Sequence, residues 1–238
     1  MKLDILVLAA HPDDAEISCG GTIAKHISLG FKVGVVDLTR GELGTRGSAE
    51  IRDEEAANSS KILGLTVREN LELRDGFFKN APEDQLKVVK AIRTYQPEII
   101  LTNAVHDRHP DHGRASDLVY QSCFLSGLTK VVTQAEEEPQ NAWRPKSVYH
   151  FIQSQYIKPD FVVDVSDFWE KKMESLRAFK SQFYDPQSKE PATFISNPGF
   201  MKLIEARGHE LGYAIGAKYG EGFTVRNLIG VNNLFHLK

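Results

Sequence analysis

The sequence predicts an α/β fold of the three-layer, Rossmann-like type, a mostly parallel sheet with helices on both faces. Two apolar runs, residues 5–10 and 98–103, show little alternation of polar and apolar side chains, as is typical of parallel strands buried on both faces. Segments with strand and helix patterns alternate along the chain, without an internal repeat. Residues 1–238 are expected to form one domain, because this length can bury a sizeable core.

Each element is assigned from its apolar pattern and from the residues that bound it. The helices over 15–29 and 49–63 stop before Gly30 and Gly64, since glycine readily takes the left-handed conformation that ends helices. Asp167 is expected to cap the helix that follows it. The predicted strands cover residues 5–10, 32–39, 68–73, 98–103, 147–153 and 161–165. The predicted helices cover residues 15–29, 49–63, 82–95, 111–127, 167–182 and 198–219.

Two similar tetrapeptides follow the two apolar runs, His11-Pro12-Asp13-Asp14 and His109-Pro110-Asp111-His112. The carboxyl ends of parallel strands gather at one edge of a sheet, where open α/β folds bind ligands, so the two motifs can meet. Imidazole and carboxylate groups bind zinc, and a catalytic zinc usually takes three protein ligands and a water. His11, Asp14 and His112 would form such a set.

The remaining side chains of the two motifs supply what a hydrolytic site needs. A metal-bound water has its pKa lowered to about 7, and a nearby carboxylate can accept its proton as it attacks a carbonyl carbon. Asp13 suits that task. A protonated imidazole can stabilise the oxyanion and then protonate the leaving amine, which makes His109 the candidate. Asp111 would lie behind an imidazole and fix its tautomer.

Each motif also has a purely structural interpretation. An Asp-Asp pair after a strand is often a helix N-cap with an acidic first turn, and a His-Pro-Asp sequence is a common turn. Capping does not compete with metal binding, so Asp14 or Asp111 could do both. The occurrence of both motifs after two buried strands favours the chemical interpretation.

The segments 10–16 and 109–112 resemble the paired signatures of the LmbE-like (PIG-L) zinc deacetylases, which remove N-acetyl groups from N-acetylglucosamine conjugates. Segments 39–47, 51–52, 180–184 and 205–207 resemble the bacillithiol-biosynthesis branch in particular. The resemblance implies hydrolysis of N-acetylglucosaminyl malate to glucosaminyl malate and acetate. Other glucosamine conjugates, including diacetylchitobiose, stay open as substrates because related enzymes share these signatures.

The resemblance also implies roles for individual residues. His11, Asp14 and His112 would bind one zinc ion per chain, with Asp13 as the general base and His109 as the oxyanion partner. Iron(II) could occupy the same ligand set, since selection often follows metal availability.

Four side chains are candidates for substrate binding. Arginine binds carboxylates through its planar fork, and Arg46, Arg52 and Arg108 flank the predicted mouth of the site. Arg52 is the first choice, because it lies one turn into the helix after the glycine-rich loop. Tyr184 could donate a phenolic hydrogen bond to the sugar. The structural alternatives are an ion pair of Arg52 with a surface acid such as Asp53, exposure of Arg108 to solvent, and a core position for Tyr184.

Some remaining residues receive structural interpretations. The glycine-rich loop over 40–47 lacks the spacing of a dinucleotide- or phosphate-binding loop, and it is interpreted as a flexible wall of the pocket. His26 and His150 are interpreted as structural or surface residues, whereas His106 is expected near the metal ligands without binding the metal. Both cysteines fall in predicted helices without metal-ligand spacing and are interpreted as reduced core residues.

Composition agrees with an ordinary soluble enzyme. A net charge of −3 with scattered Lys and Arg residues argues against nucleic acid or an anionic membrane surface as a partner. The chain has neither a signal-peptide pattern nor a run of about 18 apolar residues. We therefore expect a cytoplasmic protein. The family resemblance implies a small-molecule glycoside as its substrate, and we expect a homo-oligomer.

Two other functional classes fit part of this pattern. A metal-dependent phosphoesterase would use clustered His and Asp residues in a two-metal site, but it needs carboxylate ligands from more loops than the two motifs provide. A non-catalytic protein could hold the metal for structure alone, although such sites usually have four protein ligands that commonly include cysteine.

Overall fold

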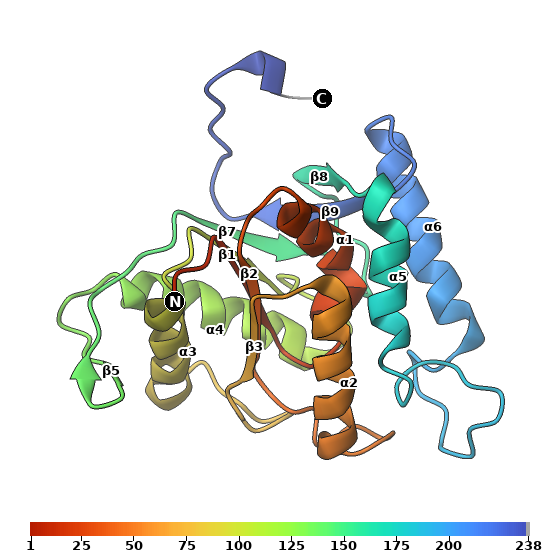
Figure 1. Cartoon of the computed structure of the whole chain (residues 1–238), viewed down its shortest axis with the longest axis horizontal. Coiled ribbons are helices and arrows are strands. Elements are labelled where there is room, and N and C mark those ends of the chain that lie inside the picture. Colours follow the sequence, from red (N-terminus) through yellow and green to blue (C-terminus); the bar gives the residue numbers. More distant parts are fainter. Residues whose placement is uncertain (237–238) are drawn as a thin grey trace.

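A seven-stranded sheet forms the centre of the computed structural model, which describes residues 1–236 (Figure 1). Its strand order is β3-β2-β1-β4-β7-β9-β8. The first five strands in this order are parallel, and β9 is antiparallel to both of its neighbours. The strands are β1 (Ile5–Ala9), β2 (Val33–Asp37), β3 (Val67–Asn70), β4 (Ile99–Thr102), β7 (Ser147–Phe151), β8 (Phe161–Asp164) and β9 (Gly220–Val225).

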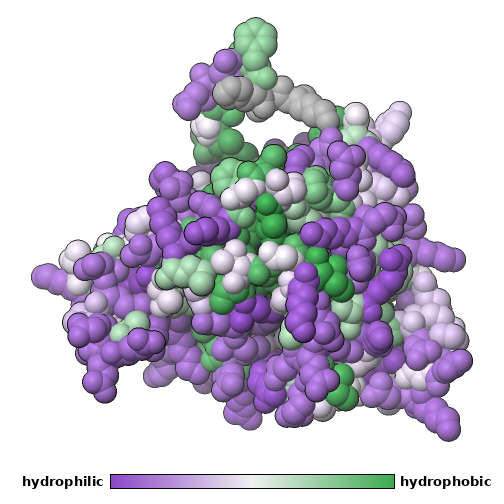
Figure 2. Space-filling view, in the orientation of Figure 1, coloured by the Kyte–Doolittle hydropathy of each residue, from purple (hydrophilic) through white to green (hydrophobic). Residues whose placement is uncertain are grey.

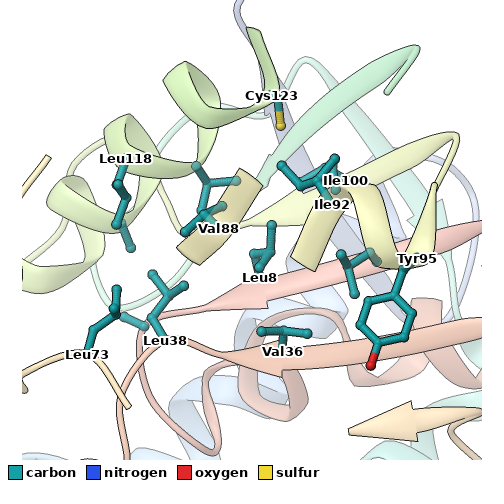
Figure 3. Close-up of a cluster of buried hydrophobic side chains, with 14 of the residues drawn as sticks. Leu8, Val36, Leu38, Leu73, Val88, Ile92, Tyr95, Ile100, Leu118 and Cys123 are labelled. Carbon is teal, nitrogen blue, oxygen red and sulfur yellow. The ribbon is translucent and has the colours of Figure 1, made fainter. Parts of the chain in front are cut away.

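Helices cover both faces of the sheet, which confirms the predicted three-layer α/β class. Strand β1 sends Leu6 and Leu8 into a cluster with α3 (Pro82–Tyr95) and α4 (Pro110–Ser126) (Figure 3). Its alternate residues enter a second cluster with α1 (Asp14–Ser28). A third cluster joins the remaining long helices, α2 (Ala49–Leu63), α5 (Trp169–Arg177) and α6 (Pro198–Ala214). Burial on both faces explains the unbroken apolar run of β1.

Helix α1 is kinked at Cys19, whose φ of −140° is not helical. The amide groups of Gly21 and Thr22, just beyond the kink, donate hydrogen bonds of 3.0 and 2.6 Å to the carboxylate of Glu221 in β9. Glu221 also forms a buried ion pair of 2.6 Å with Lys172 of α5. A carboxylate on free amide groups stabilises the start of a helical segment, so β9 caps the second half of α1.

The N-terminal half follows the predicted elements closely. Helix α2 has the predicted bounds, and Gly64 ends it with a φ of +82°. Helices α3 and α4 begin at Pro82 and Pro110, since proline is well suited to the first turn of a helix.

Four predictions for the C-terminal half are wrong. Helix α5 ends at Arg177 instead of residue 182, and it follows a 3₁₀ turn (Ser166–Phe168) without a side-chain cap from Asp167. Helix α6 ends at Ala214 instead of residue 219. Strand β9 is missing from the prediction, because its two glycines hide the strand pattern. The segment over 133–144 contains a short hairpin, β5 (Gln134–Ala135) with β6 (Glu138–Pro139).

The face shown in Figure 2 is largely hydrophilic. After β9 the chain leaves the body of the molecule as an extended segment (Figures 1 and 2). On this segment Leu228 and Phe235 are 100% and 94% exposed. Within residues 1–236, every helix is too short or too polar to cross a membrane.

Candidate metal-dependent active site

The two motifs meet at the carboxyl ends of β1 and β4. These strands are neighbours, and the chain continues from β1 to β2 on one side and returns to β4 on the other. Such a switch point leaves a crevice in which open α/β folds bind ligands. A cavity of about 670 Å³ opens here, which is within the size range of small-molecule sites. Its walls include His11, Asp13, Asp14, Arg52, Asp75, Arg108, His109, His112 and Gln153.

Asp14 lies between the two histidines that were predicted to bind zinc. Its Oδ2 atom is 3.4 Å from Nδ1 of His11, and its Oδ1 atom is 3.2 Å from Nε2 of His112. All three residues are buried. Ligand atoms at zinc–ligand distances of about 2.0–2.2 Å in a tetrahedral arrangement lie roughly 3.3 Å apart. Asp14 therefore lies at such a spacing from each histidine, through a different carboxylate oxygen for each.

The other ring nitrogen of each histidine faces a carboxylate. Nε2 of His11 is 3.1 Å from Oδ1 of Asp75 and 3.3 Å from Oδ2 of Asp111. Nδ1 of His112 is 2.6 Å from Oδ2 of Asp107. Metal-binding histidines commonly donate their second N–H to a carboxylate, which fixes the tautomer and the ring orientation. This arrangement would leave Nδ1 of His11 and Nε2 of His112 to bind a metal ion.

Two clusters among the described residues bring three ligand-type atoms within 4.8 Å of one another, His11 with His109 and His112, and His11 with Asp75 and Asp111. The second cluster is less suited to a cation. Asp111 Oδ2 accepts a hydrogen bond of 2.8 Å from the Gly76 amide, and its Oδ1 is 2.5 Å from Arg114 Nη1. The guanidinium of Arg114 places a positive charge beside Asp111, which disfavours a cation there. We therefore favour a metal position next to Asp14, rather than one between Asp75 and Asp111.

The pKa values of the proposed ligands show that this point attracts positive charge. Burial alone would lower the pKa of His11, but hydrogen bonds with Asp111, Asp14 and Asp75 raise it well above its usual value. For His112, the effect of burial is outweighed by Asp14 and Asp107, and its pKa rises to about 9. Burial would raise the pKa of Asp14, yet the two imidazoles hold it well below its ordinary value. A divalent cation would satisfy the same carboxylates.

Asp13 occupies the N-cap position of α1 with a φ of +113°, which is uncommon for a residue other than glycine. Burial raises the pKa of Asp13 to about 7, against the opposing charge of Arg52, whose Nη2 lies 3.1 Å from Asp13 Oδ2. A carboxylate with a pKa near neutrality is suited to accept and return a proton.

His109 is the N-cap residue of α4, and its Nδ1 accepts a hydrogen bond of 3.3 Å from the Asp111 amide. Its ring proton must then be on Nε2. Burial, together with repulsion from His11 and His112, lowers the pKa of His109. A neutral imidazole with an Nε2–H donor results, which differs from the protonated imidazole expected from the sequence.

The four candidates for substrate binding are placed differently. Arg52 lines the cavity, but its guanidinium donates to the Asp13 carboxylate and to the carbonyl of Pro12, not to Asp53. Arg108 is exposed on the cavity wall, with its guanidinium 4.2 Å from the centre of the Phe194 ring. The structure does not place the other two candidates, Arg46 and Tyr184, among the described residues that line the cavity.

The surroundings of Arg46 and Tyr184 differ from those expected of substrate-binding residues. Arg46 is buried, and it donates hydrogen bonds of 2.8 Å to the Ser181 carbonyl and 2.9 Å to the Ser188 hydroxyl. It therefore joins the glycine-rich loop to the segment after α5. Tyr184 is 50% exposed, so it is not the core residue of the structural alternative either.

Sequence reasoning missed four polar residues that support the site, Asp75, Asn103, Asp107 and Gln153. Each lies at or shortly after the carboxyl end of a predicted strand, so the rule that ligands gather at carboxyl ends could have placed them near the site. His106 was expected near the ligands, but it is exposed, and its neighbour Asp107 contacts His112 instead.

Comparisons with known proteins agree with this architecture. Residues 6–123 match the family model "PIG-L: GlcNAc-PI de-N-acetylase". The chain is 30% identical over 189 residues to the diacetylchitobiose deacetylase of Thermococcus kodakarensis, which covers 75% of this chain and 70% of that protein. The crystal structure of the conserved protein TT1542 from Thermus thermophilus superposes with a TM-score of 0.85 at 34% identity, covering 97% of this chain and 98% of the other.

More distant relatives indicate the range of chemistry on this scaffold. A Bacillus subtilis protein named "Probable N-acetyl-alpha-D-glucosaminyl L-malate deacetylase 2" is 24% identical over 195 residues, 76% of this chain and 84% of that protein. The 4-oxalmesaconate hydratase of Pseudomonas putida is 26% identical over 196 residues, 74% of this chain and 73% of that protein. The length and identity of the stronger matches establish that the chain belongs to the PIG-L (LmbE-like) family and is an N-deacetylase of N-acetylglucosamine conjugates.

Proposed function

We propose that the protein removes the N-acetyl group from N-acetylglucosaminyl malate, a step of bacillithiol biosynthesis. The observation that carries this choice is that one of the two arginines on the cavity wall is not paired with a carboxylate within residues 1–236. Arg52 and Arg108 are the arginines on the described cavity wall, and Arg52 is engaged by Asp13. Among the described residues no carboxylate forms an ion pair with Arg108, so its planar fork is available for a carboxylate of the aglycone.

His11, Asp14 and His112 would hold one zinc ion, and the same ligands suit iron(II). When bound, the metal lowers the pKa of water to about 7 and polarises the amide carbonyl. Asp13 accepts the proton of the attacking water, and the Nε2–H group of His109 donates a hydrogen bond to the developing oxyanion. The proton on Asp13 then passes to the leaving amine. Water and amide are thereby converted to acetate and glucosaminyl product.

A neutral conjugate such as diacetylchitobiose is the second candidate. Phe77 and Phe194, at the cavity wall, are 56% and 43% exposed, and they offer apolar surface to a second sugar ring. The Thermococcus relative, whose name states this substrate, supports the same choice. The phosphoesterase and non-catalytic interpretations gain no support from the comparisons. Cytoplasmic location and homo-oligomeric assembly remain predictions.

Acetate release from a panel of N-acetylglucosamine conjugates tests the proposal. The aglycones are malate, phosphoinositol, inositol and a second sugar. We expect the highest kcat/KM with malate, loss of activity after removal of the metal by a chelator, and recovery with zinc. Higher kcat/KM with the second sugar would contradict the malate assignment. Absence of acetate release from every conjugate would contradict the deacetylase assignment itself.

A further inference from the structure

We propose that Gln153 and Asn103 are positioning residues for Asp14, and that this amide pair sets how tightly the site binds its metal. The inference rests on the proposed role of Asp14 as a zinc ligand. Gln153 lies two residues beyond β7, and Asn103 directly follows β4. Both side chains are buried, with exposures of 6% and 0%.

Each oxygen of Asp14 accepts a hydrogen bond from one of the two amides. Nε2 of Gln153 donates to Asp14 Oδ1 at 2.8 Å, and Nδ2 of Asn103 donates to Asp14 Oδ2 at 3.0 Å. The amides also contact each other, since Asn103 Nδ2 lies 2.9 Å from Gln153 Oε1. The His11 amide also donates to Asp14 Oδ2, at 3.1 Å, so three donors hold the carboxylate between the two histidines.

Backbone donors fix the orientation of both amides. The Ala10 amide donates to Asn103 Oδ1 at 2.8 Å, and the Ala104 amide donates to Gln153 Oε1 at 3.3 Å. A backbone N–H can only donate, so the oxygen of each side chain must face it and the NH₂ group must face Asp14. Neither amide can flip without leaving buried donors and acceptors unpaired, which costs about 1–3 kcal/mol for each group.

Arg207 of α6 extends this support to a third element. Its guanidinium donates to the carbonyl of Gln153, and Nη2 lies 3.4 Å from the carbonyl of Ser154. Arg207 belongs to the late segment that resembles the bacillithiol-biosynthesis branch. It thereby anchors the backbone from which Gln153 reaches the metal site.

Because of these contacts, the affinity for zinc should depend partly on residues that do not bind the metal. Partners that orient ligating side chains typically change metal affinity by about 10- to 100-fold when they are removed. Gln153→Met keeps the length of the side chain but removes both its donor and its acceptor. We expect its dissociation constant for zinc, measured by competition with a chromophoric chelator, to rise by about 10- to 100-fold.

Gln182→Met is the matched control. Gln182 is also 6% exposed and lines the same cavity, but its amide donates to the Arg46 carbonyl and the Ser181 hydroxyl, at 2.9 and 2.8 Å. We expect wild-type zinc affinity for this variant. An unchanged dissociation constant in folded Gln153→Met, or an equal loss in Gln182→Met, would overturn the proposal.

Arg207→Met provides a second variant in case Gln153→Met does not fold. Arg207 is only partly buried, and its loss should weaken zinc binding less than Gln153→Met while circular dichroism stays unchanged. Wild-type affinity in Arg207→Met would then count against the proposal. Because zinc is titrated without substrate, failure of the malate assignment would leave these measurements unaffected.

Discussion

Arg52 Nη2 lies 3.1 Å from Asp13 Oδ2, and both side chains are buried. Nη1 of the same guanidinium lies 3.4 Å from the carbonyl of Gly41 in the glycine-rich loop. Gly41 has a φ of +64°, and a Cβ atom at this position would overlap the guanidinium of Arg52. One function of the glycine is therefore to leave room for the arginine that contacts the proposed base.

Gly41→Ala should reduce kcat because the new methyl group displaces Arg52 from Asp13. Gly30→Ala is the control, since Gly30 also has a positive φ, of +90°, but a Cβ there meets no atom within 4 Å. We expect about a tenfold or larger loss of kcat for Gly41→Ala, equivalent to about 1.4 kcal/mol. Both variants place alanine at a positive φ, and thermal denaturation measures the loss of stability that this backbone strain causes. Equal activity of the two variants would contradict this role of Gly41.

Asp13→Ala should retain zinc and lose turnover, because it removes the base and no proposed ligand. We expect kcat to fall by about 10²- to 10⁴-fold, the usual contribution of a general base. Steady-state kinetics and metal analysis of the purified variant provide the measurement.

Asp14→Ala and His112→Ala serve as comparisons for Asp13→Ala, since both should lose metal and activity together. If Asp13→Ala emptied the site and Asp14→Ala left zinc in place, the roles of the two aspartates would be reversed.

Arg108→Met should discriminate between the candidate substrates. Loss of a charge-assisted hydrogen bond costs about 1.5–3 kcal/mol, so kcat/KM for the malate conjugate should fall by about 10- to 100-fold. The neutral disaccharide lacks a carboxylate, and its kcat/KM should change little. Parallel acetate-release assays on the two substrates test this difference. A similar loss with both substrates would show that Arg108 does not recognise a carboxylate.

His150 should make the protein less stable at mildly acidic pH. Burial lowers the pKa of His150 to about 4 despite the Asn103 carbonyl, whereas an unfolded histidine has a pKa of about 6.5. The unfolded state therefore binds more protons between these pH values. The free energy of unfolding should fall by about 3 kcal/mol as the pH decreases from 6.5 to 4, and this contribution should not change further below pH 4.

His150→Asn supplies the reference for this pH dependence. Urea denaturation of both proteins between pH 4 and pH 7.5 gives the difference in free energy of unfolding, in which titrations shared by the two proteins cancel. Parallel curves for the two proteins would show that His150 does not cause the acid sensitivity.

The sequence allowed the fold class and the meeting of the two motifs to be predicted, because both follow from local signals. The unalternated run of β1 identifies a strand buried on both faces, and parallel strands bring their carboxyl ends together. That rule could place the supporting residues near the site, but it could not assign their contacts. Gln153 is distant in sequence from both motifs, and its contact with Asp14 depends on where β7 lies in the sheet.

The arginines that were predicted to bind substrate also show what sequence reasoning cannot assign. Arg46 and Arg52 both lie near the predicted mouth in sequence, but only the packed structure reveals that one is bound to Ser181 and the other to Asp13. Strand β9 was missed because its stability comes from pairing with β7 and β8 and not from its own sequence pattern.

The position of β9 has a consequence for biosynthesis. Glu221 of β9 caps the segment of α1 that follows the kink, and α1 begins at Asp14. On the ribosome, this helix cannot acquire its final contacts until residue 225 has emerged from the exit tunnel. The proposed catalytic centre consequently matures only after β9 has been synthesised, and nascent chains that stop before β9 should be inactive and readily degraded.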